Sequence, residues 1–305
     1  MSWRSCDRHT GEENAVKVHK FDAWGNDFLV LDIADVRSQG DTTGPIFRGP
    51  MLVNWPAAAR AWCDRTTGVG ADGLLLLERI DDVNARMRLY NSDGSLAEMS
   101  GNGARCFAHA LFRSDAARGE RMYRLHTDAG IREVTVGERD NDSVIASVDM
   151  GEITPLSAPQ GWDDIGAHPD RPVMHVSVGN PHTVVGVDDV SVVDVLGLGR
   201  KIPQVNLEVV APGPEQNAIT MRVHERGAGI TQACGTGACA SAWAALSWGL
   251  VPQGGERTEV LVHMPGGDAT VIVHAPSRGR VTLTGPAKHV GAYEVSWQAA
   301  MGSTS

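Results

Sequence analysis

The chain has 305 residues, of which 42% are hydrophobic and 21% charged, and its formal net charge at pH 7 is −10. This length accommodates one large domain or two of ordinary size, and the composition is that of a globular protein with a buried core. The acidic balance argues against a nucleic acid or an anionic membrane surface as a partner. It does not exclude a small zwitterionic ligand held by local groups.

The five cysteines are too few and too scattered for a disulfide framework, and no Cys-x-x-Cys pair supports a structural zinc site. The N-terminal segment is polar and lacks the apolar core of a signal peptide, and no apolar stretch is long enough to span a bilayer. We therefore expect a cytoplasmic protein without a metal, in which residues 1–15 and the last five residues are disordered.

Most apolar runs along the chain are short, rich in Val and Leu, and bounded by Gly, Asp or Asn. Runs of this kind are typical of β-strands. We predict strands at 28–31, 74–77, 173–178 and 270–273.

Two Ala-rich stretches interrupt this pattern and predict helices, at 104–111 and 238–250. Both are apolar almost all round, which indicates that each helix is buried. Trp248 and Gly249 mark the end of the second helix, since glycine commonly terminates a helix.

The two helices follow related segments, which indicates an internal repeat. In the first copy 87–90 leads to 100–104, and in the second copy 221–224 leads to 234–238. The offset is the same at both points, 221 − 87 = 134 and 234 − 100 = 134, so the two strand-loop-helix units align without a gap.

A second pair of related segments lies upstream, at 25–28 and 179–182, with an offset of 179 − 25 = 154. We predict an α/β (α+β) fold of two pseudo-symmetric domains, each a curled, mostly antiparallel sheet around a buried central helix. The first domain would comprise 16–142 and 288–305, and the second 143–287. The active site would lie in the cleft between them, where the two helix N-termini face each other.

The segment 68–73 formally matches the dinucleotide-binding pattern Gly-x-Gly-x-x-Gly. That fingerprint needs a buried strand before it and a helix after it, and 63–67 is too polar to be such a strand. Neither glycine-rich helix start is followed by Lys-Ser or Lys-Thr, so a phosphate-binding P-loop is also unsupported. We interpret this segment, which ends at Gly73, as a tight loop near the cleft.

The glycine-rich helix starts, Ser-Gly-Asn-Gly at 100–103 and Cys-Gly-Thr-Gly at 234–237, are suited to binding a carboxylate. Free backbone N–H groups and the positive end of the helix dipole attract an anion, and glycine lets the ligand approach closely. The same field is expected to lower the pKa of the Cys234 thiol below its reference of about 8.5, which would make it a thiolate base. Two facing helix starts would let one group remove an α-proton on one face of the carbon and another group return it on the opposite face. The two starts would together clamp the substrate's carboxylate and stabilise the negative charge that develops on it. This chemistry requires neither a metal nor a pyridoxal cofactor.

Six motifs occur in one order along the chain. The most specific is 233–240, Ala-Cys-Gly-Thr-Gly-Ala-Cys-Ala. The others are 24–28, 68–73, 91–95, 179–182 and 225–229. With these motifs the chain resembles the diaminopimelate epimerase family of the proline-racemase-like superfamily, from about Val16 to Glu294. The resemblance implies two pseudo-symmetric domains, no cofactor, a homodimer, and conversion of LL- to meso-diaminopimelate for lysine and peptidoglycan synthesis.

By this resemblance, Cys234 is one of two catalytic thiols and Ser100 stands at the position of the other. The remaining site residues are grouped by the part of a small amino-acid substrate that they would hold. Those near the reacting centre and its carboxylate are Asn26, Gly101, Asn102, Gly235 and Thr236. Those near the distal carboxylate and ammonium are Asn91, Asn180, Asn206, Glu225 and Arg226, with His182 as a supporting group.

Serine at position 100 departs from the family's motif, which has a cysteine there. A hydroxyl is a far weaker acid than a thiol, so one arm of a two-base mechanism is impaired. Cys106 does not replace it, because six residues along a helix place it about 240° round the axis and more than a turn deeper. Three interpretations stay open: a near-isostere, natural or engineered, in a weakened epimerase; a hydroxyl that does donate the proton; or a different reaction, such as elimination, that needs one strong base.

Two other classes of function also stay open. The chain could be a related racemase, dehydratase or isomerase with another substrate, although a racemase of a small apolar amino acid would have little use for Glu225 and Arg226. It could also be an amino-acid-binding protein made inert by Ser100, which would bind its ligand without exchanging the α-proton.

Overall fold

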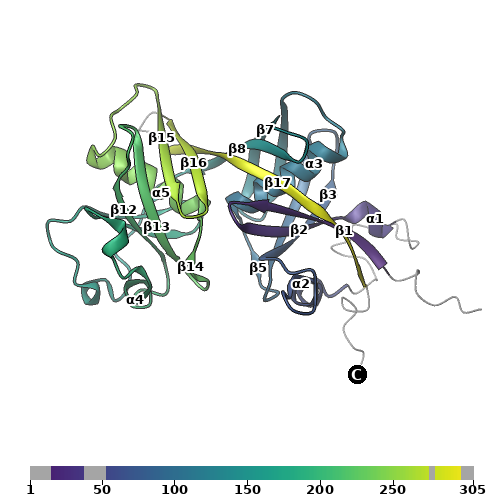
Figure 1. The fold of residues 1–305 in the computed structure, drawn as a ribbon, viewed down its shortest axis with the longest axis horizontal. Coiled ribbons are helices and arrows are strands. Elements are labelled where there is room, and N and C mark those ends of the chain that lie inside the picture. The colour runs from purple at the N-terminus through teal and green to yellow at the C-terminus, as the bar shows by residue number, and fades with distance from the viewer. Residues whose placement is uncertain (1–14, 38–52, 275–278, 297–305) are drawn as a thin grey trace, which may run out of the picture.

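The computed structural model describes residues 15–37, 53–274 and 279–296, which form two similar lobes side by side (Figure 1). The elements of the first lobe are β1 (Ala15–Ala23), β2 (Asn26–Asp32), α1 (Ile33–Arg37), α2 (Trp55–Cys63), β3 (Gly73–Arg79), β4 (Asn84–Asn91), β5 (Leu96–Ala97), α3 (Gly101–Ser114), β6 (Arg121–Thr127), β7 (Gly130–Glu138) and β8 (Ser143–Glu152). The elements that follow are β9 (Thr154–Pro155), η1 (Trp162–Ile165), β10 (Val173–Ser177), β11 (Pro181–Gly186), η2 (Val190–Val192), α4 (Val195–Gly199), β12 (Asn206–Pro212), β13 (Ala218–Glu225), β14 (Gly229–Thr231), α5 (Gly235–Trp248), β15 (Arg257–Met264), β16 (Gly267–His274) and β17 (Arg280–Ser296).

The strands of the first lobe close into a barrel around α3. β1 pairs antiparallel with β2, β2 parallel with β3, β3 antiparallel with β4, and β4 parallel with β6. β6, β7, β8 and β17 follow in antiparallel pairs, and β17 returns to β1. Because each strand of this circuit has two neighbours, the barrel has no open edge.

The second lobe repeats this order of pairings around α5. β10 pairs antiparallel with β11, β11 parallel with β12, β12 antiparallel with β13, and β13 parallel with β15. β15, β16 and β17 follow in antiparallel pairs, and β17 pairs with β8, which leads into β9, the partner of β10. The same alternation of parallel and antiparallel pairs in both lobes confirms the repeat and the pseudo-symmetric fold predicted from the sequence.

Two long strands, β8 and β17, link the lobes, and β17 crosses from one to the other in Figure 1. Within β8, 144–148 pairs with β7 of the first barrel. Any division between the lobes therefore passes through shared strands, and the predicted boundaries, 16–142 plus 288–305 and 143–287, stay predictions. Residues 1–14 and 301–305, predicted to be disordered, lie outside the described residues, whereas Ala15, included in that prediction, begins β1.

Each barrel encloses one 14-residue helix, α3 or α5, and the two begin 134 positions apart. Five buried alanines line α5, and alanine combines the highest helix propensity with a side chain small enough for the inside of a barrel. The helices predicted at 104–111 and 238–250 are confirmed. Gly249 ends α5 with φ of +74°, as expected for a glycine that terminates a helix.

The predicted strands are also confirmed. The runs 28–31 and 74–77 lie in β2 and β3, and every residue of both runs is buried. The runs 173–178 and 270–273 lie largely in β10 and within β16. In β16 buried and partly exposed residues alternate, because successive side chains of a strand point to opposite faces.

The N-termini of α3 and α5 meet where the lobes join. A Cβ on Gly235 would lie 2.7 Å from Leu283 Cδ2, 3.3 Å from Asn102 Oδ1 and 3.8 Å from Gly101 Cα. Only glycine leaves space for helix starts to approach this closely. The predicted meeting of the two starts is therefore confirmed.

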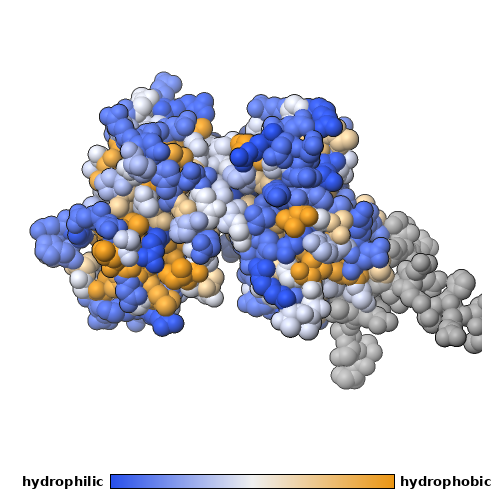
Figure 2. All heavy atoms as spheres, viewed as in Figure 1, coloured by the Kyte–Doolittle hydropathy of each residue, from blue (hydrophilic) through white to orange (hydrophobic). Residues whose placement is uncertain are grey.

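The surface in Figure 2 is mainly hydrophilic, with a narrow waist between the lobes and apolar patches on the lower part of each. No helix in 15–37, 53–274 or 279–296 is long and apolar enough to cross a membrane.

Candidate active site

A cavity of about 820 Å³ lies at the junction of the lobes, against the first turns of α3 and α5. Both lobes contribute to its wall. The predicted site residues on this wall are Asn26, Asn91, Ser100, Gly101, Asn102, Asn180, Glu225, Arg226, Cys234, Gly235 and Thr236.

Three predicted residues lie behind the wall. Asn206 is buried, and its Oδ1 accepts a hydrogen bond from the backbone N–H of Arg226 at 2.8 Å. His182 is fully buried. A Cβ on Gly73 would lie 2.8 Å from a backbone oxygen of β4, so glycine allows close strand packing there. The direct contact between Asn206 and a substrate stays a prediction.

Cys234 is the N-cap of α5, and its side chain is 4% exposed. Its Sγ accepts a hydrogen bond from Gly237 N at 3.4 Å and lies 3.5 Å from Thr236 Oγ1. Burial raises the pKa of this thiol well above its usual value, and the carboxylates of Glu225 and Glu208 raise it further, against the opposing hydrogen bonds. The predicted lowering of the pKa by the helix field is therefore wrong for the free protein, in which the thiol is protonated.

Glu225 is a half-buried carboxyl group at the end of β13, on the wall beside this thiol. Thr231 Oγ1 donates a hydrogen bond to its Oε1 at 2.5 Å. Burial raises the pKa of Glu225, while hydrogen bonds from Thr231 and Cys234 lower it. A carboxyl group beside the thiol, whose own pKa is raised by burial, is suited to receive the thiol's proton.

A buried pair, His182 and Glu208, supports the same half of the site. His182 Nδ1 lies 2.7 Å from Glu208 Oε1, and His182 Nε2 lies 2.9 Å from Asn180 Oδ1. Because an amide oxygen only accepts, Nε2 is the donor to Asn180, and a further proton is shared between Nδ1 and Oε1. A Cβ on Gly237 would lie 2.7 Å from Glu208 Oε1 and 3.3 Å from Cys234 Sγ, so this carboxylate lies close behind the thiol.

Ser100 is the N-cap of α3, and its Oγ accepts a hydrogen bond from Gly103 N at 3.0 Å. The side chain behind the Ser100 hydroxyl is apolar, whereas a carboxylate lies behind the Cys234 thiol. A Cβ on Gly103 would lie 3.4 Å from Ser100 Oγ and 3.7 Å from Leu75 Cδ2. Phe28 and Leu75 occupy the positions that the buried pair occupies in the second lobe, by the matching registers of β2 with β3 and of β11 with β12.

A chain of hydrogen bonds orients the amides on the first-lobe wall. Arg105 Nη2 donates to Asn102 Oδ1 at 2.9 Å, and Asn102 Nδ2 donates to Asn26 Oδ1 at 3.2 Å. Asn26 Nδ2 donates to Asp72 Oδ2 at 2.6 Å, and Arg65 forms an ion pair with Asp72 at 2.8 Å. Each amide accepts on one side and donates on the other, so the orientation of both is determined.

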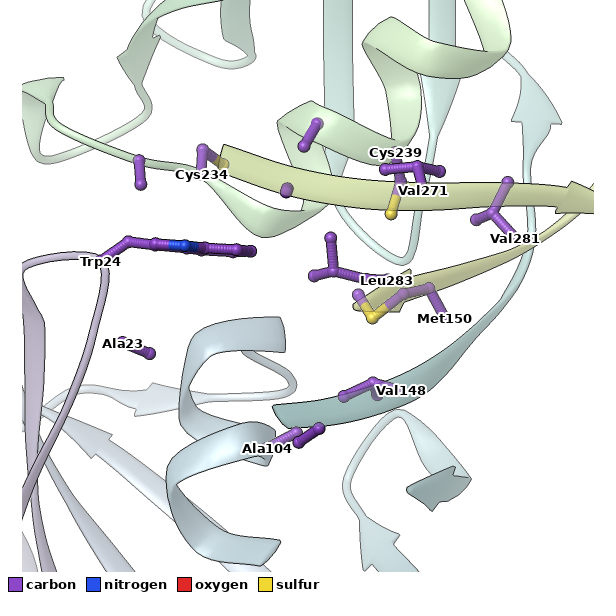
Figure 3. Close-up of a cluster of buried hydrophobic side chains, with 14 of the residues drawn as sticks. Ala23, Trp24, Ala104, Val148, Met150, Cys234, Cys239, Val271, Val281 and Leu283 are labelled. Carbon is purple, nitrogen blue, oxygen red and sulfur yellow. The ribbon is translucent and has the colours of Figure 1, made fainter. Parts of the chain in front are cut away.

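Trp24 extends from the turn between β1 and β2 into the junction of the lobes (Figure 3). Its φ is +59°, which is uncommon for a bulky residue. The ring lies 3.8 Å from Arg105 Cζ, and β17 passes so close that a Cβ on Gly285 would lie 2.1 Å from the ring. Figure 3 shows the side chain directed toward Leu283, with Cys234 on one side and α3 on the other. Trp24 thus forms part of the floor beneath both helix starts.

Further polar groups line the cavity, among them Asn91 at the end of β4 and Asn180, which contacts the first turn of α5. Asn91 Nδ2 donates to Ser95 Oγ at 2.9 Å, and Asn180 Nδ2 donates to Thr236 Oγ1 at 3.4 Å. Arg226 directly follows β13, in the turn that leads to β14, and lines the cavity. It is exposed and carries a permanent positive charge. This part of the wall can bind a second charged group of a ligand.

The residues of this arrangement that were not predicted from the sequence include Trp24, Asp72, Arg105 and Glu208. Arg105 and Glu208 do carry a signal, because each is a charged residue within a run of otherwise mostly apolar residues that forms a buried helix or strand. Within the part of the chain that the structure describes, no group of three or more His, Cys, Asp or Glu side chains is arranged to hold a metal ion.

Comparison with known families gives one match over most of the chain. The family model described as diaminopimelate epimerase matches residues 22–155 and 174–290. The diaminopimelate epimerase of Thermosynechococcus vestitus is 38% identical over 296 residues, which covers 90% of this chain and 96% of the relative. That of Pseudomonas syringae pv. syringae is 38% identical over 295 residues, covering 90% and 97%. That of Desulfitobacterium hafniense is 36% identical over 293 residues, covering 90% and 96%.

Solved structures share the fold at low sequence identity. A phenazine biosynthesis protein of the PhzF family from Bacillus anthracis superposes with a TM-score of 0.67 at 15% identity, covering 92% of this chain and 99% of its own. A hydroxyproline epimerase from Agrobacterium vitis superposes with a TM-score of 0.64 at 17% identity, covering 93% and 91%. The predicted mixed α and β fold is thus confirmed by proteins of the same architecture.

Proposed function

The chain belongs to the diaminopimelate epimerase family and is an isomerase, and from this premise we propose that it interconverts LL- and meso-2,6-diaminopimelate by proton transfer at an α-carbon, without a cofactor. One observation carries the proposal. Ser100 and Cys234, the N-caps of two helices related by the repeat, share the wall of a single cavity. Inversion at carbon needs one group on each face, and this pair can supply them.

The substrate's reacting carboxylate binds between the two helix starts. The first N–H groups of a helix have no acceptor within the helix, and both dipoles present their positive ends to the same point. The same donors stabilise the negative charge that spreads onto the carboxylate as the α-proton leaves. The meeting of Gly101 and Gly235 at this point supports the assignment.

Cys234 acts as the base, and Glu225 receives its proton. The thiol is protonated in the free protein, so it must first transfer that proton, and Glu225 is the carboxylate on the cavity wall that interacts with it. The thiolate then takes the α-proton and leaves a carbanion bound at the helix starts. The buried pair, His182 and Glu208, stays behind the thiol throughout.

Ser100 faces the α-carbon from the other helix start, and its hydroxyl returns a proton poorly. A hydroxyl forms hydrogen bonds but does not yield a stable anion near neutral pH. We therefore expect exchange of the α-proton on the side of Cys234 to be faster than inversion. An inert amino-acid-binding protein is the second candidate, which the serine itself favours, and a racemase or dehydratase with another substrate is the third.

The distal carboxylate and ammonium of the substrate would contact the polar wall formed by Asn91, Asn180 and Arg226. A substrate with a charged distal end suits the permanent charge of Arg226 better than a small apolar amino acid does. The assembly expected from the family is a homodimer in the cytoplasm, and this too is a proposal. A sedimentation mass near twice 32.5 kDa would support the dimer, and a mass of 32.5 kDa would contradict it.

The purified protein would be incubated in D₂O with LL-diaminopimelate and, separately, with the meso isomer, because the face served by Cys234 decides which isomer it deprotonates. Proton NMR would follow loss of the α-proton and formation of the other isomer. A Ser100→Cys variant would be run beside the native chain. Ser247→Cys, which adds a thiol at an exposed position of α5, is the matched control.

Formation of the other isomer by the native chain supports the epimerase. Faster inversion in Ser100→Cys alone supports the site and the substrate, with serine as the limiting group. Binding of either isomer without any exchange, in the native chain and in the variant, would support the binding protein. Neither binding nor exchange would rule out diaminopimelate and leave another substrate.

A further inference from the structure

Arg105 is a fully buried guanidinium in the first turns of α3 that forms no ion pair or hydrogen bond with a carboxylate of the described residues. Its hydrogen-bond acceptors among the described residues are all neutral: Gly101 O at 3.3 Å, Asn102 Oδ1 at 2.9 Å and Pro286 O at 3.3 Å. The fourth contact is the face of the Trp24 ring, 3.8 Å from Cζ. The charge is therefore held by dipoles and a π-face.

This guanidinium remains charged at neutral pH. Burial lowers the pKa of Arg105 to about 10, which still leaves it protonated. Asp22 acts on it only through space, without a hydrogen bond. A buried charge without a counter-ion is strongly unfavourable in a folded protein, so its retention calls for a compensating interaction.

A ligand bound in the cavity can supply the missing negative charge. Two of the groups to which Arg105 donates, Gly101 and Asn102, are themselves on the cavity wall. The guanidinium thus lies directly behind the start of α3, on the same side as the positive end of the helix dipole. An anion bound at the helix starts would be the nearest partner for its charge.

Arg105 also determines which way the neighbouring amides point. Because Arg only donates, Asn102 must turn its Oδ1 to Arg105 and its Nδ2 to Asn26, whose own Nδ2 then faces Asp72. Without this donor, the Asn102 amide would be free to reverse. Trp24, stacked on the guanidinium, would lose its support as well.

We propose that Arg105 is the positioning residue of the carboxylate clamp, and that its buried charge is neutralised by the carboxylate of a bound amino acid. The identity of that amino acid rests on the proposed function. The binding of a carboxylate does not, because it follows from the position of Arg105 behind the helix start. Arg105 acts through Asn102 and the backbone of α3, and it does not touch the reacting atoms.

The repeat supplies a matched control. The position equivalent to Arg105 in α5 is 105 + 134 = 239, a buried cysteine with no polar contact among the described hydrogen bonds. Cys239→Ala therefore alters the packing of a central helix without altering charge or amide orientation. Any loss of binding that follows from loosened packing alone would occur in this variant too.

The test uses Arg105→Met, Arg105→Lys and Cys239→Ala in the full chain. Affinity would be measured by calorimetry with meso-diaminopimelate, and by NMR titration with glycine, which carries a carboxylate and an ammonium but no distal group. Thermal unfolding would be followed on the same samples. We expect Arg105→Met to stay folded and to bind both ligands at least tenfold more weakly. Arg105→Lys, which keeps the charge but not the fork, should recover part of the loss, and Cys239→Ala should bind normally.

Equal affinity in the native chain and in folded Arg105→Met would overturn the proposal. So would equal losses in Arg105→Lys and Arg105→Met that follow the loss of thermal stability. If the native chain binds glycine but not diaminopimelate, the proposed substrate is wrong, and the effect of Arg105→Met on glycine binding still decides the role of Arg105. Failure of the native chain to bind either ligand would count against both.

Discussion

The two halves of the site share a backbone and differ in chemistry. Each half has a helix capped by a small polar side chain, Ser100 or Cys234, that accepts a hydrogen bond from the glycine three residues on. Behind Cys234 lies the buried pair of His182 and Glu208, whereas the equivalent positions behind Ser100 hold phenylalanine and leucine. The duplicated fold therefore provides two matched positions for proton transfer and places a buried histidine–glutamate pair behind only one of them.

The buried positive charge lies in the other half of the site. Arg105 lies behind the start of α3, and its equivalent in α5 is Cys239. One half of the site is thus built around a buried positive charge and the other around buried carboxyl groups. This difference predicts that the first half mainly binds the carboxylate and that the second half mainly handles the proton.

The largest expected effect separates the two N-caps. Cys234→Ala should slow exchange of the α-proton by roughly 10²–10⁴-fold, the usual contribution of an acid–base group, because no other thiol of the described residues lines the cavity. Ser100→Ala should slow exchange much less, since the hydroxyl is not the base. NMR in D₂O would measure both, with Cys63→Ala, a buried thiol of another cluster, as the control. Equal losses in the two alanine variants would mean that the halves are equivalent.

A second effect concerns the pH at which each N-cap ionises. Because burial and two carboxylates raise the pKa of Cys234, its thiolate fraction should rise about tenfold per pH unit between about pH 7 and 9, without a plateau. The rate of alkylation of Cys234, measured by mass spectrometry, reports this fraction. Glu225→Gln removes one of the groups that raise the pKa, so its curve should shift to lower pH.

A Ser100→Cys variant carries a thiol at both N-caps, so the pH dependence of their alkylation can be compared within one molecule. Leucine and phenylalanine lie behind it instead of the buried pair, so it should be alkylated at lower pH than Cys234. A plateau for Cys234 below about pH 8, near the reference value for a free thiol, would contradict the raised pKa. If the alkylation curve of Cys234 is not shifted in Glu225→Gln, the Glu225 carboxylate is not a cause of the raised pKa of Cys234.

The smallest expected effect is on the free energy of unfolding. It is measured with substitutions in the second half that introduce the apolar residues found at the equivalent positions of the first half. Glu208→Leu leaves His182 Nδ1 without its partner, which should lower the free energy of unfolding by about 1–3 kcal/mol. His182→Phe together with Glu208→Leu replaces both partners by apolar groups and should come close to the native stability. Urea denaturation would measure both, together with His182→Phe alone. A double variant that loses the sum of the two single effects would show that the pair is not a unit.

Much of the site was accessible from the sequence because it depends on local geometry. The offset of 134 placed Ser100 and Cys234 at equivalent helix starts, and the structure has them as the N-caps of α3 and α5. The glycines that follow them predicted a close approach of backbone, and Gly235 does meet Gly101. Capping and close approach are properties of a few consecutive residues, so the sequence carries them directly.

The sequence reasoning failed where distant segments decide the environment. The helix field alone predicted a lowered pKa for Cys234, but the surrounding barrel excludes water from the thiol, and Glu208 and Glu225 reach it from β12 and β13. Arg105 was not recognised because nothing nearby in the chain indicates which groups surround its charge. Desolvation and charge pairing depend on all the elements packed around a group, and these are brought together only by folding.

By itself, then, the amino-acid sequence determined the repeat, the two central helices and the identity of the residues at their starts, since these follow from periodicity and capping over short stretches. The tertiary structure alone decided which of the two starts is surrounded by titratable groups, because the residues behind them come from other strands. It also decided that the paired barrels, linked by β8 and β17, bring both starts to one cavity. The physical reason is that backbone geometry is local, whereas burial and electrostatic environment are properties of the whole packed molecule.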